Sequence, residues 1–84
     1  MQLKKPLHTK ALWLSKEAIQ KKQAGLDYTY DECEVKSVIF YDISYIAEDN
    51  TDEKEYTEVG THSGEIFVVP IHPNEFYKIV EEHR

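Results

Sequence analysis

Residues 56–69 read YTEVGTHSGEIFVV and give the clearest indication of how this chain folds. Two runs rich in strand-forming residues, 56–61 and 65–69, flank a short segment with the turn-forming pair Ser63-Gly64, a pattern typical of a β-hairpin. We place Ser63 and Gly64 at the centre of a two-residue turn. Because side chains alternate along a strand, this register predicts that four side chains share one face of the sheet: Val59, Thr61, Ile66 and Val68.

The segments around this hairpin predict further strands and a closing helix. Residues 35–41 and 43–47 contain the β-branched and aromatic side chains that strands prefer. Pro73 suits the first position of a helix. After it, apolar or amphipathic side chains recur at helical spacing (Phe76, Ile79, Val80 and His83), which predicts an amphipathic helix over 73–83 that packs on the sheet.

The N-terminal part predicts a second helix, near residues 16–24. Ser15 is a favourable N-cap residue and Gly25 suits the position just past the helix end. Residues 1–8 are expected to form an irregular arm because Pro6 disfavours a regular start. Residues 7–14 are compatible with either a strand or a helix.

These elements predict one small α+β domain over residues 1–84. The expected architecture has two layers, with an antiparallel sheet of three or four strands (35–41, 43–47, 56–61 and 65–69) and two helices. A chain of 84 residues has room for a single core. Cys33 is its one cysteine, so no disulfide within the chain is expected and a reducing compartment, the cytoplasm, is favoured. No apolar run reaches the ~20 residues of a membrane span, and no signal peptide is expected.

Charge is distributed unevenly along the chain. Residues 1–23 contain six lysines and one glutamate, whereas residues 24–84 contain fifteen carboxylates and four basic residues. This asymmetry indicates either a basic segment that binds an acidic or phosphate-bearing partner, or a segment that docks on the protein's own acidic body. The stretch Glu48–Glu55 is expected to be a solvated acidic loop, since it lacks the ligand spacing of a calcium loop.

No catalytic or metal-binding motif is recognisable. The four histidines (His8, His62, His72 and His83) lack the short spacings of zinc ligands. Ser63 and His62 are neighbours in sequence, and adjacent strand residues point to opposite faces, so they do not form a nucleophile–base pair. We therefore expect a protein without enzymatic activity, metal or cofactor.

Aromatic residues are the remaining signal. Six Tyr, three Phe and one Trp make up 12% of the chain, and Tyr and Trp are enriched at binding surfaces. The candidate residues for binding a partner or ligand combine these aromatics with lysines: Trp13, Lys16, Lys21, Lys22, Tyr28, Tyr30, Tyr45 and Tyr56.

The succession of residues 42–46, 57–64 and 76–80 resembles the strand, hairpin and helix order of LytTR-type DNA-binding domains and of short flagellar-regulator-like proteins. The resemblance implies a DNA-binding role, but the acidic charge of this half opposes binding to duplex DNA, which requires neutralisation of phosphates. In size, charge and lack of a catalytic motif the chain also resembles small phage proteins that inhibit host defences.

Three functions follow from these patterns. The first is a non-enzymatic module that binds a protein partner stoichiometrically, as a homo-oligomer. The second is a protein that sequesters a small ligand of the nucleotide type, with tyrosines stacking on the base and lysines meeting phosphate. The third is a nucleic-acid-binding regulator that uses the basic N-terminal segment.

Overall fold

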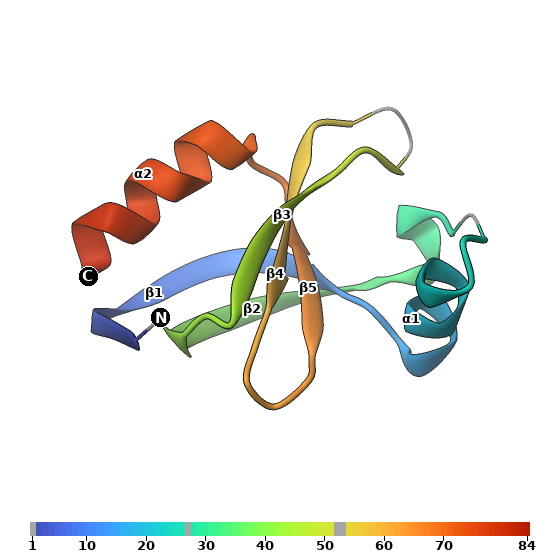
Figure 1. Ribbon diagram of the computed structural model, residues 1–84, viewed down its shortest axis with the longest axis horizontal. Coiled ribbons are helices and arrows are strands. Elements are labelled where there is room, and N and C mark those ends of the chain that lie inside the picture. Colours follow the sequence, from blue (N-terminus) through green and yellow to red (C-terminus); the bar gives the residue numbers. More distant parts are fainter. Residues whose placement is uncertain (1, 27, 52–53) are drawn as a thin grey trace.

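Figure 1 shows the computed structural model, which describes residues 2–26, 28–51 and 54–84. Its elements are β1 (Gln2–Trp13), α1 (Lys16–Gln23), β2 (Glu34–Asp42), β3 (Tyr45–Asp49), β4 (Tyr56–Gly60), β5 (Ile66–Val69) and α2 (Pro73–His83). In the described part of the chain, the strands form one antiparallel sheet in the order β2-β1-β5-β4-β3. The predicted α+β class is confirmed, but the sheet has five strands, not three or four.

The sheet bends into two parts that cross each other. β1 and β2 pair over residues 7–13 and 34–40, whereas β1 meets β5 only at Leu12 and Trp13. The β1–β2 ribbon therefore leaves the β3–β4–β5 meander at one corner and runs across it; in Figure 1 the ribbon lies horizontally and the meander vertically. The space between the two parts holds the main hydrophobic core.

β1 differs most from the sequence-based expectation. Residues 2–8, which we expected to be irregular, form the first part of this strand. Residues 7–14 were compatible with a strand or a helix, and they form a strand as far as Trp13. The strand is fixed by side chains that enter the core: Leu3, Leu7 and Ala11. The register with β2 shifts between residues 2 and 7, where Pro6 lacks the N–H that a regular ladder needs. As a result, α1 follows a strand and does not open the fold.

The turn between β4 and β5 contains three residues, not the two that we expected. The Thr61 N–H donates to the Glu65 carbonyl at 3.0 Å, and the Gly64 N–H donates to the Thr61 carbonyl at 3.1 Å. Gly64 has a φ of +87°, which side-chain-bearing residues rarely adopt. A three-residue loop that ends in such a glycine is a common hairpin connection.

The extra turn residue shifts the predicted hairpin register by one position, so the predicted facing pairs are wrong. Val59 lies opposite Phe67, and Glu58 lies opposite Val68. Because a shift of one residue changes which residues share a face, Val59 and Phe67 point into the main core while Val68 points to the other face. Val59 and Thr61 therefore do not face Val68 and Ile66, and Gly60 makes room for the ring of Tyr45, which lies opposite it on β3.

The two helices cover opposite faces of the meander. α2 begins and ends where its sequence predicted, and its Phe76 and Val80 are fully buried in the main core. α1 is capped by Ser15, whose Oγ accepts from the Ala18 N–H at 3.2 Å, as predicted. On that side of the meander a second, smaller cluster of buried residues forms from Leu14, Ala18, Tyr28 and Val68. β4 and β5 are therefore buried on both faces.

Candidate functional site

A network of polar side chains joins α1 and the segment after it to the edge of the meander. At its centre is Asp49, which is 2% exposed. Its Oδ2 accepts from the Tyr28 hydroxyl at 2.6 Å and from the Lys22 ammonium at 3.1 Å, and its Oδ1 accepts from the Tyr30 hydroxyl and the Thr51 backbone N–H, each at 2.9 Å. Four donors therefore surround one buried carboxylate.

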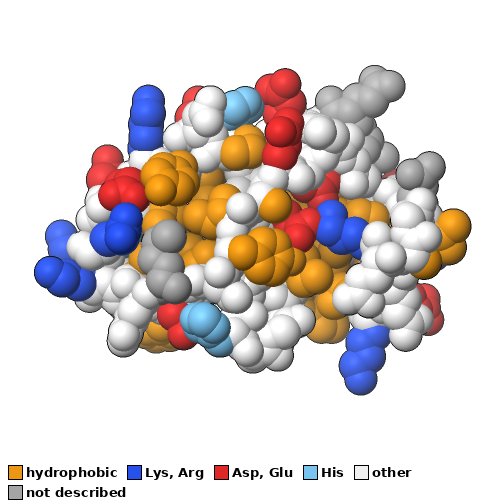
Figure 2. Space-filling view, viewed as in Figure 1, with side chains coloured by type: hydrophobic (Ala, Val, Ile, Leu, Met, Phe, Trp, Pro, Cys, Tyr) orange, Lys and Arg blue, Asp and Glu red, His pale blue; other side chains and the backbone are white. Residues whose placement is uncertain are grey.

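A second carboxylate completes the network. Glu58 on β4 forms an ion pair with Lys22 and accepts from the Tyr45 hydroxyl at 2.6 Å. Lys22 thus bridges Asp49 and Glu58. In Figure 2, acidic and basic side chains meet where α1 approaches the sheet, while hydrophobic side chains occupy much of the surrounding surface.

The electrostatics of this network favour its charged acid and its neutral phenols. Burial on its own would raise the pKa of Asp49, but hydrogen bonds from Tyr28, Thr51 and Tyr30 hold that pKa well below its usual range. Burial, reinforced by the hydrogen bonds to carboxylates, raises the pKa values of Tyr28, Tyr30 and Tyr45. Burial lowers the pKa of Lys22, but its bonds to Glu58 and Asp49 outweigh this, so the pKa is raised overall.

Four of the predicted binding residues thus belong to this network: Lys22, Tyr28, Tyr30 and Tyr45. Tyr56 joins it through its ring, which stacks on Tyr30 with 5.2 Å between the ring centroids. The sequence identified these residues but not the carboxylates that hold them together. Asp49 lay in the stretch 48–55 that we predicted to be a solvated loop; this is wrong for Asp49, while residues 52 and 53 lie outside the described residues.

The other predicted residues lie apart from the network. Trp13, at the end of β1, has the Lys36 ammonium 4.2 Å from its ring centroid. Lys16 is exposed at the start of α1, and Lys21 is half-buried on the same helix. A hollow of about 550 Å³ adjoins Lys22. Because the Lys22 ammonium is already paired with two carboxylates, it attracts a phosphate less than an unpaired lysine would.

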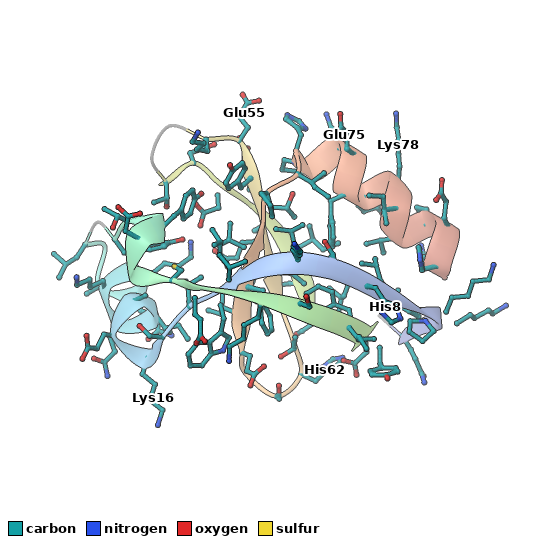
Figure 3. The ribbon with its side chains drawn as sticks, turned by 180° about the vertical axis from the view of Figure 1, so that it is seen from behind. His8, Lys16, Glu55, His62, Glu75 and Lys78 are labelled. Carbon is teal, nitrogen blue, oxygen red and sulfur yellow. The ribbon has the colours of Figure 1, made fainter. Side chains whose placement is uncertain are left out.

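The outward face of the β1–β2 ribbon carries exposed apolar side chains in a row. Val35, Ile39 and Tyr41 lie on one face of β2, with Ser37 between the first two, and are 67%, 44% and 65% exposed. Across the ribbon, Leu12 lies opposite Val35 and His8 lies opposite Ile39, so these side chains project to the same side. We call Val35, Ile39 and Tyr41 the β2 row. Figure 3 looks onto this face, with the ribbon in front of the meander.

β2 is also an edge strand. In the described part of the chain no strand pairs with its side away from β1. Next to this edge, the β4–β5 turn forms the other wall of a groove of about 200 Å³, lined by residues 38–42 together with Thr61, Ser63, Glu65 and Phe67. The surface therefore combines free backbone hydrogen-bonding groups with apolar side chains, which are the two elements of strand-mediated recognition.

A signal for this surface is present in the sequence of β2. Residues 38–41 are all apolar, whereas a strand with one solvated face alternates apolar and polar residues. On β2 this apolar run places Phe40 in the core on one face and leaves Ile39 and Tyr41 exposed on the other.

Comparisons of the chain with protein-family models, with curated proteins and with solved structures find no match. Among the described residues, no group of three or more His, Cys, Asp or Glu side chains is placed to hold a metal ion. No helix within residues 2–26, 28–51 and 54–84 has both the length and the apolar character needed to cross a membrane.

Proposed function

We propose that this protein is a non-enzymatic module that binds another protein stoichiometrically through the outward face and free edge of β2. The observation that carries the proposal is the β2 row, which exposes three large apolar side chains on one face of an edge strand. Exposed apolar residues scattered singly are normal, but a row of them on one strand is typical of an interaction surface. An edge strand adds backbone groups that a partner strand satisfies.

The contacts within the polar network favour a structural role for it over a catalytic one. Asp49 and Glu58 already accept hydrogen bonds from side chains of the same chain. A general base or nucleophile needs a lone pair directed at a substrate. The lone pairs of these two carboxylates instead accept hydrogen bonds that connect α1 to the sheet. We place the module in a reducing compartment such as the cytoplasm because Cys33 is the one cysteine of the chain, so no disulfide forms within it.

The proposal is tested by crosslinking from defined positions. p-Benzoylphenylalanine replaces Ile39 in one protein and Tyr77 in a matched control; Tyr77 is 52% exposed on α2, outside the β2 row. On irradiation in the source cell, we expect a covalent protein adduct from position 39 and none of the same mass from position 77.

The captured protein is then purified and titrated with wild-type chain and with a V35T/I39T/Y41T variant, which keeps strand-favouring residues but removes apolar surface. We expect 1:1 binding that the variant weakens by about tenfold or more, since truncating a central interface residue costs more than about 1 kcal/mol. Equal affinity of the variant with an unchanged melting temperature, or adducts from position 77 alone, would refute the proposal. Sedimentation of the free protein, run in parallel, measures the self-association that the sequence led us to expect.

A further inference from the structure

We propose that the partner segment bound at β2 is an extended, basic peptide that adds a strand to the sheet beside residues 38–42. This inference rests on the proposed function and specifies the chemistry of its partner. The free edge of β2 offers backbone N–H and C=O groups at the spacing of a strand, which an extended chain matches residue by residue. Residues of the β4–β5 hairpin form the other side of the groove.

Charge selects a basic peptide. Two carboxylates line the groove, Asp42 from the end of β2 and Glu65 from the β4–β5 hairpin, and no Lys or Arg is among the described residues that line it. The side chain of Asp42 is 45% exposed, and its Oδ2 lies 3.8 Å from Nε2 of His62. These carboxylates would attract a lysine or arginine of the incoming strand, whereas an acidic peptide would be repelled.

The apolar surface beside β2 determines which other side chains the bound peptide should carry. A strand beside β2 projects alternate side chains to the two faces of the ribbon. On the outward face they would lie next to Ile39 and Tyr41, which are exposed in the free protein. On the inward face they would meet the groove wall formed by Thr61, Ser63 and Phe67. The expected peptide therefore alternates apolar residues with hydroxyl-bearing or basic ones.

The probe is a library of random nine-residue peptides displayed on phage and selected against the immobilised protein. We expect the selected peptides to be enriched in Lys or Arg flanked by β-branched or aromatic residues. One selected peptide is synthesised in two N-methylated forms, on odd or on even residues. Because only alternate residues of a strand face a given neighbour, methylation in one phase should weaken binding by about tenfold or more, and in the other phase far less.

A charge variant provides the second test. D42N/E65Q should weaken a selected basic peptide by about three- to tenfold, since each exposed ion pair contributes at most ~1 kcal/mol. The control is E75Q/E82Q, which removes two exposed carboxylates from α2 and should leave affinity unchanged; Figure 3 shows Glu75 on that helix, away from the groove. Amide NMR shifts on peptide addition should centre on residues 38–42.

Several outcomes overturn the inference. Selected peptides without basic residues, equal effects of the two methylation phases, or unchanged affinity in D42N/E65Q would each contradict it. Protection of the β2 edge by dimerisation of the free protein would show that the occupant is a second copy. If V35T/I39T/Y41T weakens the protein partner while these peptide tests fail, the inference falls and the proposed function stands. If that variant also binds normally, both fall.

Discussion

Replacing Asp49 with Asn tests whether the buried polar network holds α1 against the sheet. The asparagine oxygen can take the place of Oδ1 and keep the bonds from Tyr30 and the Thr51 N–H. Its amide group then takes the place of Oδ2 and directs N–H groups toward the Tyr28 hydroxyl and the Lys22 ammonium, which lie 2.6 Å and 3.1 Å away. Two donors lose their acceptor, and one of them is charged.

The expected loss of stability follows from these contacts. A hydrogen bond that involves a charged group contributes about 1.5–3 kcal/mol, and removing one partner of a buried ion pair costs about 3–5 kcal/mol. Lys22 keeps Glu58 and is 28% exposed at its side chain, so the lower end applies. We expect the free energy of unfolding to fall by about 3 kcal/mol, and the melting temperature of a domain this size by roughly 12–24 °C.

Urea unfolding followed by circular dichroism at pH 7 measures this change. The matched control is Glu48→Gln, which neutralises the exposed carboxylate next to Asp49 on the same strand and should stay within about 0.5 kcal/mol of wild type. If Asp49→Asn also stays within that range, the network contributes nothing to stability, and the interpretation of Lys22 and the tyrosines as structural residues fails.

Three further results are expected. Asp49 has a depressed folded-state pKa, so its contribution is complete above its unfolded pKa of about 3.9 and is lost as pH falls toward the folded value; acid unfolding between about pH 5 and 2 should be steeper for wild type than for Asp49→Asn. Phe76→Ala should cost about 3–5 kcal/mol in urea unfolding, because the ring is fully buried, and a cost below 1 kcal/mol would contradict the placement of α2. Gly60→Ala places a Cβ against the Tyr45 ring and should cost about 1–3 kcal/mol, but much less in a Tyr45→Ala background; additive costs would show that the two residues are not in contact.

The elements that the sequence predicted well are those whose signals are local. Pro73 and the 3.6-residue spacing after it define α2, and Ser15 defines the start of α1. The hairpin was also found, but its register was wrong because Ser63-Gly64 suits both a two-residue turn and the end of a three-residue turn. A positive φ at Gly64 fits both turns, so only the hydrogen bonds of Thr61 and Gly64 and the pairing of β4 with β5 distinguish them.

The parts that were missed depend on contacts between distant segments. β1 fully buries every fourth residue, Leu3, Leu7 and Ala11, although every second residue of a strand points to the same face. No strand pattern in the sequence shows this spacing. Asp49 reads as one of many acidic residues between 48 and 55, and its burial arises only when α1 and Tyr28 fold over the end of β3. Burial of a charge is a property of the tertiary structure.

The lysines of the basic N-terminal segment fall into two groups with different physical roles. Lys22 is drawn into the fold by Asp49 and Glu58, so at this position the basic segment docks on the protein's own acidic body. The lysines of β1 and Lys16 stay exposed, and the β2 row lies on the same ribbon as β1.

Substitutions in the polar network should therefore change stability, while substitutions in the β2 row should change binding at constant stability. Because the hydrogen bonds and the ion pair of Asp49 reach no residue of the β2 row, the effects of the two changes should add when they are combined, as expected for independent sites. Measuring the unfolding free energy of D49N in the V35T/I39T/Y41T background checks this: a coupling energy above about 0.5 kcal/mol would show that the network and the ribbon surface form one unit.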